Sequence, residues 1–295
     1  MTDTRPTWYD RRGVLALGAT GVATLAGCGG PSGGAPADDA DSPTGATETS
    51  TQTPTSTPTA TGTATYMNGV GPDASVSFAV PTDGAELTST SVQWDATAEG
   101  VTIEAAGEVT EGAGHYHVMV DTDPVTPGEI IPSDDAHIHY GTGQTDGVLE
   151  LEPGEHTLHL QVADGEHRAM GLTDTVDVTV ADEASLSVET SVEGSVVDWT
   201  VTAEKYTIEP SSSGINSNAG HLHAIIDTDP VPLGDVIPTD ARHVHYGDGS
   251  TSGTIDLAEQ LGDDYDPGEH TIHFQVGTGT HRATMVHVRT TVTTS

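Results

Sequence analysis

The residues best suited to chemistry are histidines that occur in pairs with one residue between them. His115 and His117 form the first pair, and His137 and His139 form the second. In an extended strand, residues i and i+2 project from the same face, so each pair presents two imidazoles side by side. Neutral imidazole is the commonest side-chain metal ligand in proteins. The spacing therefore predicts strands whose histidines could bind one ion.

The same pattern returns in the second half of the chain. His221 and His223 repeat the first pair, and His243 and His245 repeat the second. Of the 15 histidines, all but His287 have an equivalent in the other copy. Because the two copies differ at most other positions, we infer that these histidines have a common role.

We hypothesise one metal site in each repeat. Three or four imidazoles suit Zn or Cu, whereas Ca and Mg prefer oxygen ligands. The candidate ligands are the two pairs and one later histidine of each repeat: His115, His117, His137, His139 and His167, then His221, His223, His243, His245 and His281. His156 and His270 are additional candidates. Each lies three residues before another histidine, on the opposite face of its strand.

Two other interpretations of the histidines stay open. They could donate hydrogen bonds to carbonyls or carboxylates and so replace Lys and Arg, of which the chain has 8. The protein would then be a structural or adhesive surface module without metal. A bound copper could instead make it an oxidoreductase. We favour metal binding without catalysis and assign no catalytic residue, because the sequence has no Gly-x-Ser-x-Gly elbow and no phosphate-cradling loop.

Residues 1–27 have the layout of an export signal. Arg11 and Arg12 precede a weakly apolar run, which ends in a Leu-Ala-Gly-Cys sequence at Cys28. A twin arginine in this position is typical of a Tat signal, and the four-residue ending is similar to a lipobox. We therefore expect cleavage before Cys28 and a lipid on its thiol. The lipid would anchor the protein in the membrane, on the extracellular face of the cell.

The charge of the chain excludes one class of partner. It carries 45 acidic residues and a formal net charge of −37. A surface this negative repels the phosphate backbone, so we expect no binding to nucleic acid. The composition resembles that of exported proteins from salt-loving archaea, in which salt screens the mutual repulsion of the carboxylates.

The remaining sequence predicts a stalk and two tandem domains. Residues 28–71 are rich in Gly, Pro, Ser, Thr and Asp and have little to bury, so we expect a disordered stalk. Short alternating strands separated by turn residues follow, twice, and predict an all-β fold of two immunoglobulin-like β-sandwiches. We place them at residues 72–181 and 182–295. Trp94 and Trp199 occupy equivalent positions, and we expect each to lie in a core.

Several motifs recur in a fixed order. In the first copy they are Gly114-His-x-His, Ile131-Pro132, Gly141-Thr-Gly-Gln-Thr, Pro153-Gly-Glu-His-Thr-Leu and Asp164-x-x-His. This order resembles the DUF4399 family, which comprises exported bacterial and archaeal domains of uncharacterised function. The second copy departs from the pattern where Ser250 replaces the Gln and Thr278 replaces the Asp. The resemblance implies tandem domains of this family and supplies no chemistry.

Overall fold

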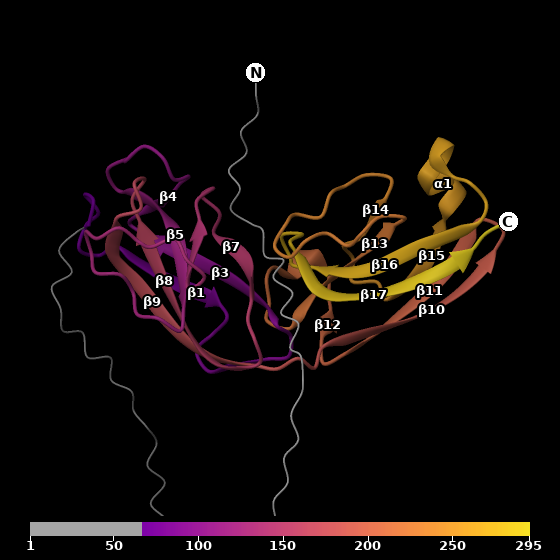
Figure 1. Ribbon diagram of the computed structural model, residues 1–295, viewed down its shortest axis with the longest axis horizontal. Coiled ribbons are helices and arrows are strands. Elements are labelled where there is room, and N and C mark those ends of the chain that lie inside the picture. Colours follow the sequence, from indigo (N-terminus) through magenta and orange to yellow (C-terminus); the bar gives the residue numbers. More distant parts are fainter. Residues whose placement is uncertain (1–66) are drawn as a thin grey trace, which may run out of the picture. The chain divides into compact units, whose positions relative to one another are not determined.

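The computed structural model describes residues 67–295, so the expected signal peptide, Cys28 and the stalk up to residue 66 lie outside the described residues. Two β-sandwiches follow one another along the chain, each with a three-stranded sheet and a larger sheet (Figure 1). This confirms the predicted all-β fold with two tandem immunoglobulin-like sandwiches. Within residues 67–295, no helix has the length and apolar character needed to cross a membrane.

The first sandwich has one small sheet and one larger sheet. Its strands are β1 (Ser75–Val80), β2 (Ala85–Leu87), β3 (Ser91–Glu99), β4 (Thr102–Ile103), β5 (Ala113–Val120), β6 (His137–Tyr140), β7 (Asp146–Glu150), β8 (Gly154–Ala163) and β9 (Ala169–Val180). The small sheet has the order β1-β3-β7. In the larger sheet β2, β9, β8, β5 and β4 are neighbours in that order, and β6 also pairs with β5.

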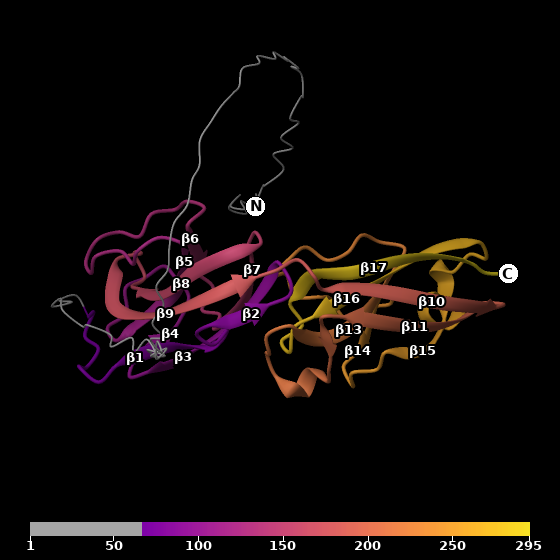
Figure 2. The same cartoon turned by 90° about the horizontal axis from the view of Figure 1, so that it is seen from below.

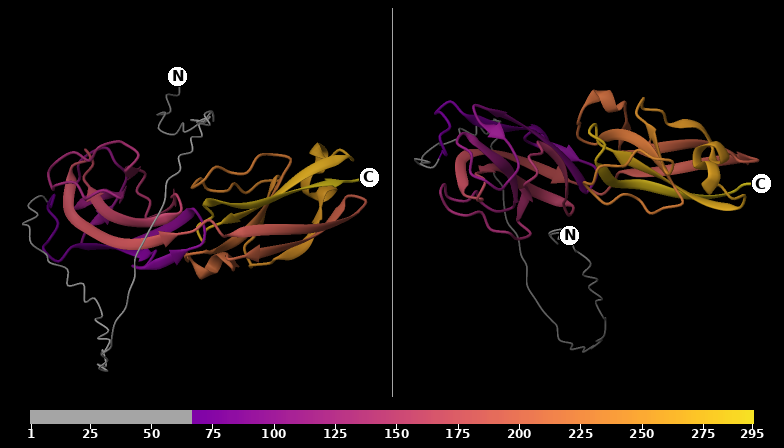
Figure 3. Two further views of the ribbon diagram at one scale, coloured as in Figure 1. Left: turned by 60° about the horizontal axis from the view of Figure 1, so that its bottom comes forward. Right: turned by 90° about the horizontal axis from the view of Figure 1, so that it is seen from above.

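The second sandwich repeats this plan without a counterpart of β2. Its elements are β10 (Ser185–Glu193), β11 (Val196–Glu204), β12 (Thr207–Ile208), a 3-10 turn (Ser211–Ser213), β13 (Ala219–Ile226), β14 (His243–Tyr246), β15 (Ser252–Asp256), α1 (Leu257–Leu261), a second 3-10 turn (Gly262–Asp264), β16 (Glu269–Gly277) and β17 (Ala283–Thr293). The sheets have the orders β10-β11-β15 and β12-β13-β16-β17, and β14 pairs with β13. The long strands β16 and β17 run side by side in every view (Figure 2, Figure 3).

The helix α1 lies in the segment that makes the second copy longer than the first. The carboxylate of Asp256 accepts hydrogen bonds from the backbone N–H groups of Ala258 and Glu259 and so caps the first turn. Leu257 and Leu261, four residues apart on one face of the helix, are both buried in the core of the sandwich. One capped turn is too short to give the extended helical periodicity that a sequence pattern reveals.

The cores follow the alternation of the strands. In β5, Tyr116 and Val118 point into the first sandwich and pack with Trp94, which is 0% exposed. Trp199, 2% exposed, has the same place in the second sandwich. The prediction that both tryptophans are buried in cores is confirmed. His115, His117 and Met119 alternate with these residues along β5 and point to the opposite face of the larger sheet.

That outer face is covered by the segment between β5 and β6. We call residues 121–136, and the equivalent residues 227–242 between β13 and β14, the cover loops. Ile131 of the first cover loop packs in a small apolar cluster with Met119 of β5 and with Ala163 and Ala169. The histidines on the outer face of β5 therefore lie between a sheet and a loop.

The first sandwich also takes in residues that we expected in the stalk. Met67 and Val70 pack against its core, and the side chain of Asn68 donates hydrogen bonds to the carbonyls of Thr110 and Ala113. The chain therefore joins the sandwich five residues before the expected boundary at residue 72.

Candidate metal centre

Four histidines of the first sandwich meet on the outer face of its larger sheet. His115 and His117 come from β5, His139 comes from β6, and His167 lies in the turn between β8 and β9. One ligand nitrogen from each ring lies within 4.8 Å of the others. The Nε2 atoms of His115 and His117 are 3.0 Å apart, and those of His139 and His167 are 3.2 Å apart.

These separations suit an ion with four nitrogen ligands. Bonds of about 2.0–2.1 Å to zinc place tetrahedral ligands about 3.4 Å apart and square-planar neighbours about 2.9 Å apart. The two Nε2–Nε2 distances, 3.0 and 3.2 Å, lie between these limits. An N–H···N hydrogen bond would explain either contact alone, but it would not explain why both pairs approach one point.

The second sandwich repeats the cluster. Ligand atoms of His221, His245 and His281 lie within 4.8 Å of one another, and Nε2 of His223 is 2.9 Å from Nε2 of His221. Ring centroids within each cluster are 4.7 to 5.8 Å apart. The longest centroid separation in each cluster is 5.8 Å, between His117 and His167 in the first copy and between the equivalent His223 and His281 in the second.

The strand register decides which candidates take part. In the antiparallel pair β5–β6, His117 lies opposite His139, whereas His137 lies opposite Met119, further from His115. Nδ1 of His137 is 2.7 Å from a carboxylate oxygen of Asp134. The structure therefore brings together four of the five candidates in this copy and leaves His137 outside.

The second copy has the same outcome at His243. This residue pairs with Ile225 in the β13–β14 register, and its Nδ1 is 2.7 Å from a carboxylate oxygen of Asp240. Both excluded histidines thus have an acidic partner three residues earlier in the chain. Sequence spacing alone did not separate them from the histidines that cluster.

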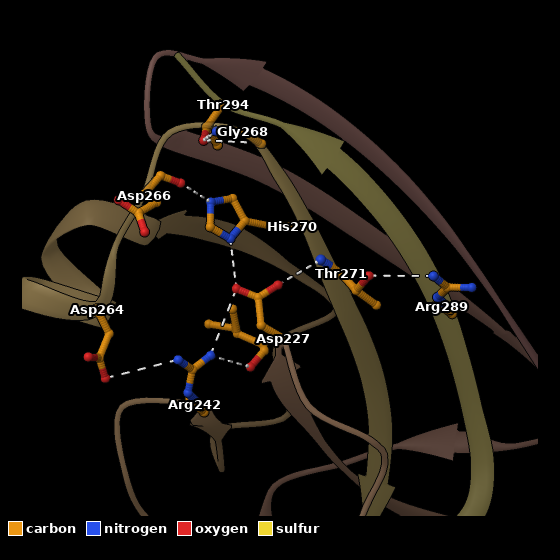
Figure 4. A network of polar contacts seen from close by, with 10 residues as sticks. Asp227, Arg242, Asp264, Asp266, Gly268, His270, Thr271, Arg289 and Thr294 are labelled. Atoms are coloured by element: carbon orange, nitrogen blue, oxygen red, sulfur yellow. Dashed lines mark hydrogen bonds and ion pairs between the residues drawn. The ribbon is translucent and has the colours of Figure 1, made fainter.

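His156 and His270, the additional candidates, also lie outside the clusters. Nδ1 of His270 is 2.7 Å from a carboxylate oxygen of Asp227, and Nε2 is 3.0 Å from the carbonyl of Asp266 (Figure 4). Both partners offer oxygen atoms that accept hydrogen bonds. This geometry is the hydrogen-bonding role that the metal-free interpretation gave to the histidines.

His156 makes the same contacts in the first sandwich. Its ring nitrogens lie 2.7 Å from a carboxylate oxygen of Asp121 and 2.8 Å from the carbonyl of Glu152. Burial lowers the pKa of His156, but its hydrogen bonds to Asp121 and to the Glu152 carbonyl outweigh burial and raise it above the usual value. His156 is therefore stabilised as a cation.

Two glycines make room for the exposed histidine of each cluster. A Cβ atom on Gly141 would lie 2.1 Å from Cε1 of His139, because the imidazole folds back over the glycine two residues later. Gly247 has the same relationship with His245, at 2.2 Å. The repeated His-x-Gly spacing was visible in the sequence, but only the ring orientation explains it.

The fourth ligand of each cluster sits on a strained turn. His167 has φ 67°, in the left-handed region that most side chains avoid. The carboxylate of Asp164 accepts hydrogen bonds from the N–H groups of Glu166 and Arg168, and the N–H of His167 donates to the Asp164 carbonyl. These bonds hold the turn that directs His167 toward the cluster.

In the second copy, where Thr278 replaces the Asp, part of the hydrogen bonding of this turn is retained. His281 also has φ 67°, and its N–H donates to the carbonyl of Thr278. The Thr278 hydroxyl accepts from the N–H of Arg282 at 3.1 Å, which replaces one of the two bonds that the carboxylate accepts in the first copy. A hydroxyl therefore suffices for the turn.

The two buried rings of each cluster are held in the neutral state. Burial, followed by repulsion from the neighbouring histidines, lowers the pKa of His115 to about 3 and that of His117 to about 2. The same causes lower the pKa of His221 to about 4 and that of His223 to about 2. Metal ions bind neutral imidazole, so near neutral pH these side chains are in the form that a metal requires.

The buried rings also have unsatisfied hydrogen-bonding groups. Among the described residues, the Nδ1 atoms of His115, His117, His221 and His223 are buried without a hydrogen-bond partner. An unsatisfied buried polar group costs about 1–3 kcal/mol. A cation bound by the Nε2 atoms would leave each Nδ1 as a buried N–H, so the fit to a transition metal rests on the close approach of the Nε2 atoms.

Both copies match one known family of domains. A family model described as a domain of unknown function (DUF4399) matches residues 95–181 and 199–295. The chain belongs to this family. Each DUF4399 match contains one full histidine cluster, so the tandem arrangement predicted from the motifs is confirmed. A search of curated proteins finds no match.

The solved structures that match this chain are distant in sequence. Fibronectin(III)-like modules of Clostridium thermocellum CbhA have 10% identity and a TM-score of 0.25, over 75% of this chain and 94% of that chain. A β-glucuronidase from Parabacteroides merdae has 12% identity and a TM-score of 0.21, over 72% of this chain and 23% of that chain.

Proposed function

We propose that each DUF4399 sandwich binds one transition metal ion, copper or zinc, through four imidazoles and without catalysis. One observation carries this proposal. Rings from three separate segments of the chain, β5, β6 and the β8–β9 turn, place their ligand nitrogens within 4.8 Å of one another. The second sandwich has the equivalent rings in nearly the same positions.

The histidines outside the clusters provide an internal comparison. His137, His156, His243 and His270 each have a carboxylate oxygen 2.7 Å from a ring nitrogen. The clustered rings have one another instead, with Nε2 atoms in contact. The two buried rings of each cluster have Nδ1 atoms without a hydrogen-bond partner, so hydrogen bonding to a carboxylate accounts for the first group and not for the second.

The ligand set favours copper or zinc. Each group of candidate ligands consists of histidines alone. Imidazole nitrogen suits zinc and copper, whereas calcium and magnesium require oxygen ligands. For a given set of nitrogen ligands, copper(II) binds more tightly than zinc, so we expect copper to displace zinc.

Four protein ligands favour binding over catalysis. Structural zinc sites use four protein ligands, whereas catalytic sites have three and keep a position open for water or substrate. With His115, His117, His139 and His167 all bound, a four-coordinate ion would have no free position. A copper-dependent oxidoreductase would need one ring to leave the ion.

We further propose that the protein is a lipoprotein on the extracellular face of the cell membrane. The twin arginine at Arg11 and Arg12 and the lipobox-like ending at Cys28 support this proposal. The acidic composition supports an environment of high salt. Replacement of Cys28 by Ser should move the protein from the membrane fraction to the soluble fraction, and unchanged fractionation would contradict the anchor.

Metal analysis of the purified chain tests the proposed function. The protein incubated with excess copper or zinc and then desalted should retain two ions per chain. The double variant His117→Ala and His139→Ala should retain one ion. His159→Ala is the matched control, because His159 lies on β8 outside the cluster and bonds to Thr175. Full metal content in the double variant would refute these ligands, and no retained metal in the unaltered chain would favour the structural or adhesive alternative.

A further inference from the structure

Gln161 is a buried polar side chain next to the first cluster. It lies on β8 directly opposite His117 in the strand register and is 0% exposed. Its amide nitrogen donates to the carbonyl of Val125 at 2.8 Å and to that of Met170 at 3.2 Å. Its amide oxygen accepts from the N–H of Val125 at 2.9 Å. The whole side-chain amide is therefore used to hold other parts of the chain.

Val125 belongs to the cover loop, so these bonds connect the loop to the sheet. Where the loop crosses the face of β8, it cannot pair with the backbone of that strand, whose N–H and C=O groups point along the sheet. Residues 128–131 of the loop pair instead with the backbone of residues 167–169, at the start of β9. The Gln161 amide supplies both a donor and an acceptor perpendicular to that plane and pairs with Val125 as a strand backbone would.

In the second sandwich, Gln275 makes the same set of hydrogen bonds. This side chain is 0% exposed and bonds to the N–H and the carbonyl of Val231 at 2.9 and 2.8 Å. Its amide nitrogen also donates to the carbonyl of Thr284 at 2.8 Å. Thr284 occupies the position of Met170, so the backbone contacts are kept although that side chain has changed.

The held loop encloses two of the four rings. His115 is 0% exposed and His117 is 2% exposed, whereas His139 is exposed. The cover loop also bonds to the segment of the fourth ring, because the N–H of Ile131 donates to the carbonyl of His167 at 2.9 Å. An ion at the cluster would thus have a loop over its two buried ligands and solvent near one ligand.

The loop of the second sandwich is fixed at its first residue as well. Asp227 accepts from His270 and from the N–H of Thr271, and Arg242, at the far end of the loop, lies 3.8 Å from the same carboxylate (Figure 4). These contacts secure the two ends of the loop, and Gln275 holds Val231 near its start. Backbone hydrogen bonds join residues 234–237 to residues 281–283.

We propose that Gln161 and Gln275 are positioning residues that keep the cover loops closed over the metal ions and so slow metal exchange. This inference rests on the proposed function. An ion with four imidazole ligands leaves stepwise, as each ring turns away and water or a competing ligand takes its place. His115 and His117 have no space to turn while the loop is closed. Exchange therefore requires local opening of the loop, and the open population sets its rate.

The test is metal release from the full chain loaded with two zinc ions, followed with a chromogenic chelator in excess. In Gln161→Leu, one ion should leave about ten- to hundredfold faster, the factor expected when two or three buried hydrogen bonds are lost. The other ion should keep its original rate. Gln275→Leu is the matched variant, and it should accelerate only the other ion. Reloading should also become faster, because a loop that opens more often admits the ion more often.

Hydrogen exchange of the metal-free chain gives a second readout. Gln161→Leu should increase exchange in residues 121–136 and leave residues 227–242 unchanged. If Gln161→Leu does not fold, Gln161→Met keeps a similar length and removes the amide donor and acceptor without adding a charge. Unaltered release rates in variants that bind two ions would overturn the inference and leave the proposed function standing. An unaltered chain that binds no zinc would overturn both.

Discussion

His117 and His139 lie directly opposite each other in the antiparallel β5–β6 pair, with ring centroids 4.9 Å apart. His223 and His245 have the same relationship in β13–β14, at 5.0 Å. Side chains at directly opposite positions are the closest pairs that two strands provide. The register therefore brings the two His-x-His pairs together, and the other two rings of each cluster approach this central contact.

Gly141 should be required for the first site. A Cβ in Gly141→Ala would collide with the His139 ring and force it out of the cluster. We expect the affinity of the first site for zinc to fall by about tenfold or more, since one of four ligands is misplaced. Competitive zinc titration measures this. Gly71→Ala is the control, because a Cβ there meets no atom within 4 Å. Equal affinities in both variants would contradict the role of Gly141.

The turn that carries His167 should depend on an oxygen acceptor at position 164. Asp164→Ala removes two hydrogen bonds from a backbone that is already strained at φ 67°. We expect weaker zinc binding at the first site. Asp164→Thr should retain most of the affinity, because Thr278 supports the same turn in the second copy. Equal losses in the Ala and Thr variants would show that the turn does not need the oxygen.

The metal-free protein should become less stable as the pH is lowered, because of the buried histidines of the two clusters. Burial lowers the pKa values of His115, His117, His221 and His223 in the folded protein to about 2 to 4, below the usual value of 6.5. As pH falls below 6.5, the unfolded chain gains protons that the folded chain does not, so folding is disfavoured. The loss should start near pH 6.5 and continue toward pH 3.

Urea unfolding at several pH values measures this effect. The many carboxylates also titrate at low pH, so the informative quantity is the difference between the unaltered chain and the variant His117→Ala with His223→Ala. The variant should lose less stability between pH 7 and pH 5. Parallel pH dependences would mean that the buried rings do not resist protonation.

His270 should stabilise the fold and have no effect on metal content. His270→Ala removes hydrogen bonds to Asp227 and to the Asp266 carbonyl (Figure 4). We expect the free energy of unfolding to fall by about 1–3 kcal/mol, the usual effect of bonds to charged groups. Thermal unfolding and metal analysis of the same sample check both parts. A reduced metal content in folded protein would place His270 closer to the ion than we infer.

Most of the fold followed from local patterns. The alternating strands, the buried tryptophans and the shared face of each His-x-His pair depend on a period of two residues, which the sequence displays directly. The short strand β2 and the helix α1 were missed, because three and five residues are too few to establish a period. Tertiary packing, through Leu257 and Leu261, supports α1.

The sequence was less informative about which residues form the site. Which histidines meet depends on the β5–β6 register, and a connection of 16 residues does not determine a register. His137 was therefore indistinguishable from His139. Gln161 has the alternation of an outward-facing residue, and its burial arises only because the cover loop folds over it. The roles of Gly141 and Asp164 depend on a ring orientation and a turn that no local pattern specifies.

X-ray absorption at the metal edge of the chain loaded with two zinc or copper ions tests the central claim most directly. Our account predicts four nitrogen ligands at about 2.0 Å, with the multiple-scattering pattern of imidazole and no sulfur. The variant His117→Ala with His139→Ala should bind one ion with an unchanged spectrum, from the second sandwich. A first shell dominated by carboxylate oxygen, or containing fewer than three imidazoles, would show that these rings are not the metal site.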